Sequence, residues 1–201
     1  MTDEPASRDD RGSRMGMWFF LLSELMLFGG LFILYAVYLT RYTADFVKAG
    51  AELSAPLGTA NTLVLLTSSL FAALSVTAIQ RDRRATACLM LALTLACALA
   101  FLGVKYVEWS AKFAHGIYPD SPALGARPHG EIIFFGLYFT IAGLHALHVV
   151  VGAGLLGVSA AMTARGTLHA GRYVLLENSA LYWHLVDMIW IFIFPLFYLI
   201  V

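Results

Sequence analysis

The chain alternates between long apolar runs and short polar stretches. An α-helix needs about 20 mainly apolar residues to cross the hydrocarbon core of a bilayer. Five runs are long enough, near residues 15–39, 59–80, 85–110, 131–162 and 178–201. The fourth is long enough to indicate a tilted helix. The pattern predicts an all-α, polytopic membrane protein built as a bundle of five transmembrane helices.

The segment before the first run, residues 1–14, mixes three arginines with four acidic residues and has no apolar stretch. The run that follows is too long for the apolar region of a signal peptide, and it lacks a convincing cleavage site. We therefore expect it to remain in the mature protein. Because no internal repeat stands out, the sequence predicts one transmembrane domain over 15–201, preceded by an amino-terminal segment, 1–14.

Composition supports the membrane class. Hydrophobic residues make up 60% of the chain and charged residues 13%, whereas roughly a quarter of residues are charged in soluble domains. The formal net charge is zero, and the dense basic cluster Arg81–Arg84 is too short for a nucleic-acid patch. We therefore expect no nucleic-acid partner.

Lysines and arginines outside the five runs are distributed unevenly between the two sides of the predicted bundle. The amino-terminal side carries eight, and the opposite side carries four, namely Arg41, Lys48, Lys112 and Arg127. Positive residues favour the cytoplasmic side. The count predicts a cytoplasmic amino terminus, and the absence of a transit peptide favours a bacterial plasma membrane.

Ionisable side chains within the apolar runs are the candidates for function. Each would cost several kcal/mol if it faced lipid unpaired, so we expect them to point into the bundle. They are Glu24, Lys105, Glu108, His145, His148, His184 and Asp187.

Depth along the helices predicts which of these side chains meet. At 1.5 Å per residue, Glu24 and Asp187 each lie about 14 Å from the cytoplasmic ends of their runs, with His184 about 9 Å in. His148 reaches the same region from the opposite side if the helices adjoin. We therefore predict one polar network of Glu24, His148, His184 and Asp187 in the cytoplasmic half.

A second group, Lys105 and Glu108, lies three residues apart near the outer end of the third run. Opposite charges at this spacing share one helix face and can pair, and a lysine near a helix end can extend its ammonium group towards the interface. The sequence therefore predicts a self-contained ion pair here.

Three interpretations of the inner network compete. His145, His148 and His184 are suitable metal or haem ligands, but no cysteine or facing His-Glu motif supplies the further ligands of a redox site. A proton relay would use the same polar residues as carriers, because apolar surroundings shift their protonation towards neutral pH. Alternatively, these groups only bond between helices and fix their packing. We expect no metal site and no hydrolytic centre in this chain.

Other local features suggest packing. Small residues permit close approach of helices, and aromatic residues near helix ends favour the membrane interface. Hydroxyl groups of serine and threonine bond back to their own helix. The residues concerned are Gly29, Gly30, Gly143, Gly152, Gly154 and Gly157; Trp18, Trp109, Tyr182, Trp183 and Tyr198; and Thr67, Ser68 and Ser69.

Five motifs follow one another along the chain: Gly16–Glu24 with Gly29–Tyr38 after it, Asn61–Thr62 with Thr67–Ser69, Lys105 with Glu108–Trp109, Gly143–Val149, and Glu177 followed by Tyr182–Asp187 and Trp190. In this order, over about residues 15–198, they resemble subunit III of the haem-copper oxidases.

The resemblance implies an accessory subunit of a respiratory terminal oxidase that carries no haem or copper itself. Haem and copper would lie in partner subunits: catalytic subunit I, which reduces oxygen to water while protons are pumped, and subunit II. The family's third subunit packs on subunit I, binds phospholipid and supports proton uptake. Glu24 matches the family's buried, carbodiimide-reactive glutamate. Further polar candidates for helix packing are Asn61, Lys105, Glu108, His145 and Glu177.

The chain also departs from the longer family members, which have seven spans, because it lacks the first two. The family's lipid cleft between a two-helix and a five-helix group is therefore not assumed, although lipid could fill an exposed groove. The ending Phe194–Leu199 is similar to small proteins that accompany nitric oxide reductases, and quinol oxidases have a related subunit, which leaves the electron donor open. A free-standing proton-coupled transporter is the remaining rival, disfavoured by the absence of a repeat.

Overall fold

A computed structural model describes residues 5–199 of the chain. Five long helices are apolar enough to cross a membrane, which confirms the predicted fold class. The helices are α1 (Pro5–Arg41), α2 (Thr43–Gly50), α3 (Ala55–Gln80), α4 (Arg84–Ala114), α5 (Pro122–Gly125), α6 (His129–Arg165) and α7 (Val174–Tyr198). Residues 1–4 of the predicted amino-terminal segment and residues 200–201 of the last predicted span lie outside the described residues.

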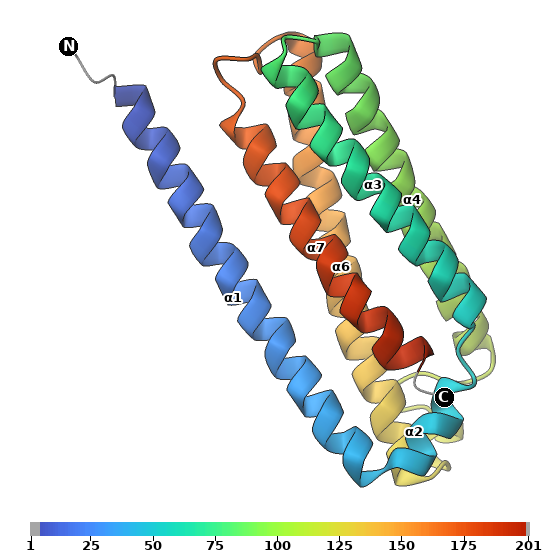
Figure 1. The fold of residues 1–201 in the computed structure, drawn as a ribbon. Coiled ribbons are helices and arrows are strands. Elements are labelled where there is room, and N and C mark those ends of the chain that lie inside the picture. The colour runs from blue at the N-terminus through green and yellow to red at the C-terminus, as the bar shows by residue number, and fades with distance from the viewer. Residues whose placement is uncertain (1–4, 200–201) are drawn as a thin grey trace.

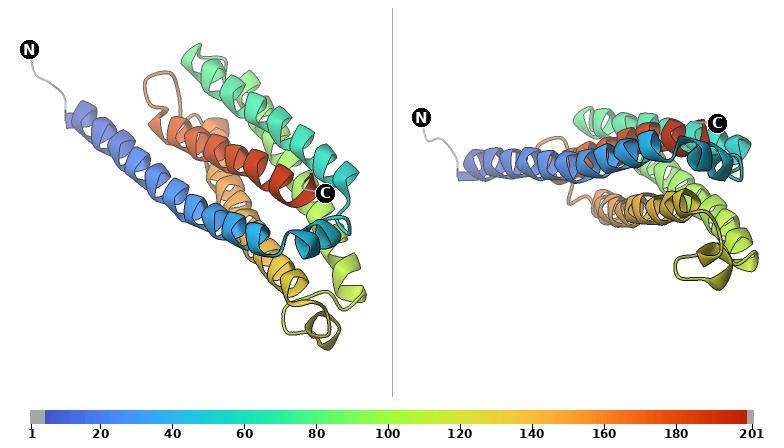
Figure 2. Two further views of the ribbon diagram at one scale, coloured as in Figure 1. Left: turned by 60° about the horizontal axis from the view of Figure 1, so that its bottom comes forward. Right: turned by 90° about the horizontal axis from the view of Figure 1, so that it is seen from below.

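The long helices form two layers (Figures 1 and 2). Viewed from below, α1, α7 and α3 lie in one layer and α6 and α4 in the other. The helix pairs α3 and α4, α6 and α7, α3 and α7, and α4 and α6 are in contact, while α1 lies at the edge against α6 and α7. Four helices therefore enclose the core, and one lies on its flank.

The helices extend past the predicted spans. α1 begins at Pro5, before the apolar run near 15–39, and α6 extends over 37 residues. The apolar run indicates only the part of a helix that lies in hydrocarbon, whereas the helix itself continues into the polar region. α6 ends where Gly166 takes a left-handed conformation with φ of 77°, which glycine adopts without steric cost.

The core is rich in aromatic side chains. Trp183, Tyr182 and Tyr198 are almost fully buried, so their rings contact the interior of the bundle and not its surroundings. They face the inner side of α7, and the ring nitrogen of Trp183 donates to Ser68 Oγ at 3.0 Å. Trp18 instead remains 63% exposed on α1. An aromatic ring whose polar atom finds a partner can be buried at any depth of the bundle.

Of the glycines predicted to permit close packing, Gly152 does so most clearly. A Cβ atom at this position would lie 2.8 Å from the Trp183 ring. A Cβ at Gly143 would make ordinary contact with Trp109, and at Gly29, Gly30, Gly154 and Gly157 it would have nothing within 4 Å. Gly152 therefore lets the Trp183 ring of α7 pack closely against α6.

Candidate functional site

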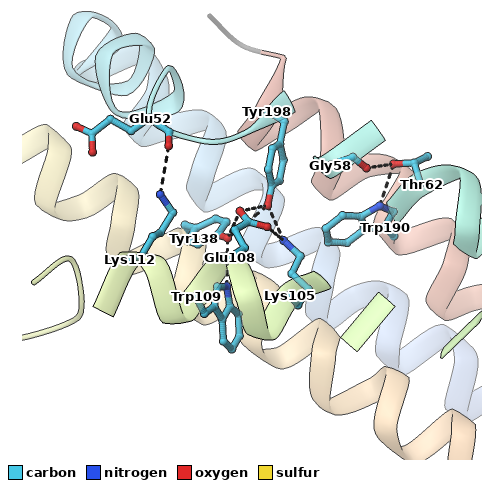
Figure 3. A network of polar contacts seen from close by, with 10 residues as sticks. All are labelled: Glu52, Gly58, Thr62, Lys105, Glu108, Trp109, Lys112, Tyr138, Trp190 and Tyr198. Atoms are coloured by element: carbon cyan, nitrogen blue, oxygen red, sulfur yellow. Dashed lines mark hydrogen bonds and ion pairs between the residues drawn. The ribbon is translucent and has the colours of Figure 1, made fainter. Parts of the chain in front are cut away.

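A buried polar cluster joins α4, α6 and α7 near the ends of these helices beside α2 (Figure 3). Lys105 Nζ lies 3.0 Å from Glu108 Oε2 and 2.5 Å from the Tyr198 hydroxyl. Glu108 Oε1 accepts hydrogen bonds from Tyr138 at 2.8 Å and Tyr198 at 2.6 Å. Trp109 Nε1 donates to the Tyr138 hydroxyl at 3.1 Å. The charges of both ionised groups are thus satisfied by partners on three helices.

Aromatic faces complete the surroundings of the Lys105 ammonium group. Its nitrogen lies 4.7 Å from the ring centre of Trp190, 5.0 Å from Tyr198 and 5.6 Å from Tyr138, distances at which an aromatic face attracts a cation. Lys105 is 3% exposed. The predicted pairing of Lys105 with Glu108 is confirmed. The expectation that the pair is self-contained and that its lysine extends to the interface is wrong, because tyrosines from α6 and α7 enclose it.

A second pair links the flanking helix to the bundle. His148 Nε2 of α6 lies 2.8 Å from Glu24 Oε2 of α1, and each side chain is 13% exposed. Phe28 packs edge-on against the His148 ring, with 5.3 Å between the ring centres. The predicted meeting of Glu24 and His148 is present in the structure.

The hydrogen bonds of His148 determine how protons are arranged in this pair. Its Nδ1 lies 2.7 Å from the Leu144 carbonyl, which only accepts, so Nδ1 carries a proton. Nε2 then either donates to an ionised Glu24 as imidazolium or accepts from a protonated Glu24 as neutral imidazole. In both forms the 2.8 Å contact holds one proton shared between the two side chains.

His184 and Asp187 of α7 belong to a different group. His184 Nδ1 lies 2.5 Å from Ser69 Oγ of α3, so Ser69 bonds across helices, whereas Thr67 and Ser68 bond to their own helix as predicted. Asp187 is 3% exposed. No hydrogen bond among the described residues joins Asp187 or His184 to Glu24 or His148. The structure thus divides the predicted four-residue network into a flank pair and a group between α3 and α7.

Three buried side chains in the core form no hydrogen bond of ordinary geometry among the described residues: Asn61, His145 and Asp187, although Ser68 and Ser69 lie beside Asp187. The His145 ring lies between the rings of Phe101 and Trp190, with ring centres 5.6 and 5.2 Å away. Asn61 and His145 were predicted as polar packing residues, and both are fully enclosed within the bundle. Buried polar groups normally find a hydrogen-bond partner. These three positions are therefore the least satisfied polar sites of the interior.

Glu177, the remaining predicted packing residue, lies in the first turn of α7. Its Oε2 is 2.8 Å from the guanidinium of Arg14 on α1. One residue later, Asn178 Nδ2 donates to Ser13 Oγ at 3.0 Å. The start of α7 is thus tied to the early part of α1 by two polar contacts.

Charged residues at the opposite end form a cluster that the sequence did not predict. Lys48 of α2 and Arg127 both pair with Glu131 of α6, at 2.7 and 3.2 Å, and Arg127 also pairs with Glu52 at 2.6 Å. The hydrogen bond to Glu131 raises the pKa of Lys48 above its ordinary value. These residues lie in or beside the polar stretches between the predicted spans, where spacing along the chain gives no indication of pairing.

An apolar groove runs between α1 and α7. It comprises a cavity of about 330 Å³ lined by residues including Trp18, Leu25 and His184, and one of about 130 Å³ that includes Gly29. His184 therefore contacts Ser69 and also lines this groove. Gly29 widens the groove where a larger residue would narrow it.

The residues missed by sequence reasoning are chiefly the tyrosines around Lys105. Tyr138 lies seven residues before His145 on the same buried stripe of α6, and this spacing could have placed it on the inner face. Across the described residues, no three His, Cys, Asp or Glu side chains gather in a way that could hold a metal ion.

Comparison with known proteins gives a consistent result. The family model for cytochrome c oxidase subunit III matches residues 5–200. Subunit 3 of the cytochrome bo(3) ubiquinol oxidase of Pseudomonas aeruginosa is 29% identical over 98% of this chain and 90% of its own length. Subunit 3 of the cytochrome c oxidase of Thermostichus vulcanus is 29% identical over 92% of this chain and 86% of its own length.

A third relative joins two subunits in one chain. The haem-copper oxidase subunit I+III of Aeropyrum pernix is 29% identical over 93% of this chain, which corresponds to 22% of the relative. The match thus covers nearly all of the present chain and a small part of a larger oxidase polypeptide.

Proposed function

We propose that this chain, which belongs to the cytochrome c oxidase subunit III family, is the noncatalytic third subunit of a bacterial cytochrome c oxidase. The observation that carries the proposal is the family match across residues 5–200, nearly the whole five-helix bundle. The complex would reduce oxygen to water and move protons. This subunit would stabilise the catalytic subunit, bind lipid and support proton uptake.

The electron donor is the finer part of the proposal. A relative named as a cytochrome c oxidase subunit and two named as quinol oxidase subunits are each 29% identical to this chain. Sequence identity therefore favours neither electron donor. We propose cytochrome c, with quinol as the alternative. The donor would bind to other subunits, so the experiment below addresses the whole complex.

The proposed partner is catalytic subunit I, with subunit II in the same complex. The fused subunit I+III of Aeropyrum pernix supports this choice, since one polypeptide there carries both parts. α1 offers a broad apolar face for lipid or a partner helix, with Phe19 69%, Met26 65% and Ile33 68% exposed. Exposed apolar patches of this extent mark lipid contact or association.

The proposed setting is the bacterial plasma membrane, with the amino terminus in the cytoplasm. The excess of lysine and arginine on the amino-terminal side, eight against four, supports this orientation. The Glu24–His148 pair would then lie on the flank of the bundle within the membrane. There its shared proton would act as a local reservoir for uptake, next to an apolar groove that suits an acyl chain.

The test is to purify the tagged chain in mild detergent, with whatever assembles with it, and to record its visible spectrum and oxygen uptake. We expect haem bands from partner subunits and oxygen uptake with reduced cytochrome c as donor. Uptake with quinol alone would assign the quinol oxidase. Consumption of nitric oxide would assign an accessory protein of a nitric oxide reductase.

A colourless, monodisperse protein without partners would contradict the proposal and favour the free-standing proton-coupled transporter. Reconstitution into vesicles with a pH-sensitive dye would then measure proton movement directly. A Glu24→Gln variant provides a matched control in both experiments, because Gln keeps a hydrogen bond to His148 but cannot hold the shared proton.

A further inference from the structure

A cavity of about 580 Å³ lies at the end of the bundle where α3 begins and α4 ends. Its lining includes Leu57, Val107, Glu108, Lys112 and Arg127. It is separate from the apolar groove between α1 and α7, which has no residue in common with it. Its size is in the range of small-molecule sites.

The charges around this cavity are paired with one exception. Glu108 pairs with Lys105, Glu52 with Arg127, and Glu131 with both Arg127 and Lys48. Asp45 accepts a hydrogen bond from the Gly130 amide at the start of α6, 3.2 Å away. Lys112 is the remaining cation. No carboxylate that the structure describes lies within ion-pair distance of it.

Lys112 is also poorly satisfied as a donor. Its side chain lines the cavity and the residue is 7% exposed. Its ammonium group has one long hydrogen bond of 3.4 Å to the Glu52 carbonyl and lies 5.4 Å from the ring centre of Phe135. Figure 3 shows the Glu52 carboxylate turned away from Lys112 while the carbonyl faces it. An ammonium group has three donors, and a buried charge without a counterion is costly. An anion in the cavity would accept hydrogen bonds from the ammonium group and neutralise its charge.

The wall of the cavity indicates what carries that anion. Val107 is 63% exposed and Leu57 is 38% exposed, so an apolar side of the cavity lies on the outer surface of the bundle. The cationic side lies at the helix ends, where lipid head groups are found. A lysine or arginine side chain near a helix end can extend its charged group to the level of the lipid phosphates.

We propose that this cavity binds the phosphate of a phospholipid through Lys112, with Arg127 beside it and an acyl chain along Leu57 and Val107. Lysine and arginine form strong charge-assisted hydrogen bonds to phosphate oxygens. The bound phosphate completes the charge pairing at this end of the bundle and joins α4 to the segment between α5 and α6. This site is separate from the apolar groove between α1 and α7 that the proposed function assigns to an acyl chain.

Binding of dioleoyl phosphatidylglycerol to the delipidated, tagged assembly, measured by native mass spectrometry, tests the proposal. We expect Lys112→Gln to weaken the tightest lipid adduct about tenfold, the effect of losing one charge-assisted hydrogen bond. Lys48→Gln is the matched control, because it removes a cation from the same end but outside the cavity lining. It should leave this adduct unchanged within about twofold.

A second variant keeps the test decisive if Lys112→Gln fails to assemble. Val107 lies on the exposed apolar surface, where a larger apolar residue is tolerated. In the Val107→Trp variant, the indole ring would occupy the path of the acyl chain. It should also weaken the tightest adduct. Dioleoylglycerol, which has the chains but no phosphate, should not bind at this site.

Equal lipid binding by the wild-type and both variants would overturn the proposal. Binding of inorganic phosphate alone, with displacement of the lipid adduct, would assign the cavity to a free anion and overturn the lipid assignment. Because bound lipid is measured directly, neither result depends on oxidase activity. A failed oxidase assignment and a failed lipid site would therefore be distinguished.

Discussion

A lysine–glutamate ion pair and a histidine–glutamate hydrogen bond lie in very different surroundings. Lys105 and Glu108 are enclosed by tyrosines and a tryptophan from three helices, and Glu108 has every close contact filled. Glu24 and His148 meet on the flank between α1 and α6, and each side chain is 13% exposed. The first pair holds helices in one arrangement. The second joins the flanking helix α1 to α6 and is less enclosed, so the two pairs differ in access and not in polarity alone.

A third pair extends the comparison to the surface. Lys48 is 68% exposed at its side chain, although its partner Glu131 is buried. The three pairs thus form a series in burial, from enclosed through the flank to exposed. Coulombic attraction and the cost of breaking a pair both grow as water is excluded. We expect the effects of substitution to follow this order.

The largest effect is expected from Glu108→Gln. The variant leaves Lys105 in the enclosed site without a countercharge, and breaking a buried pair costs about 3–5 kcal/mol. SDS unfolding in mixed micelles, monitored by tryptophan fluorescence, measures the loss.

The double variant Lys105→Met with Glu108→Gln is its control. It removes both charges and should recover most of the stability, because no uncompensated charge remains. If the double variant unfolds as readily as Glu108→Gln alone, the tyrosine bonds, and not the charges, dominate this cluster.

A smaller effect is expected from Glu24→Gln. The glutamine amide can donate to His148 Nε2 while Nδ1 keeps its proton for Leu144, so the interhelical bond survives. The loss should be about 1 kcal/mol or less, and the subunit should still assemble. Co-purification with partner subunits and the same unfolding assay measure both.

Glu24→Ala serves as the control for the hydrogen bond itself. It leaves His148 Nε2 without this partner and should destabilise α1 packing more than the glutamine does. Loss of assembly in Glu24→Gln would contradict the reservoir assignment, because it would mean that the ionised pair is required for the structure.

The fold could be predicted from the sequence because the apolar runs directly reflect the bilayer thickness. The hydrogen-bond partners that side chains find on other helices could not be predicted. The depth estimate correctly brought Glu24 to His148, but it placed Asp187 in the same network, because depth fixes one coordinate and not the position around the bundle. His184 contacts Ser69, and Lys105 contacts Tyr198, because of how each helix is rotated about its own axis. A single sequence carries that information only weakly.

The smallest effect is expected at Lys48, and it should depend on pH. Glu131 raises the pKa of Lys48, so the folded protein holds this proton more tightly than the unfolded chain does. The pair therefore stabilises the fold fully below the ordinary pKa of 10.5, and the contribution is lost as the pH rises through the higher folded value. Lys48→Met should be slightly less stable than the wild type at pH 8, and the difference should vanish in strongly alkaline buffer. SDS unfolding of both proteins across this range measures the difference. A difference that persists above the raised pKa would assign the effect to packing of the lysine side chain and place Lys48 outside the series.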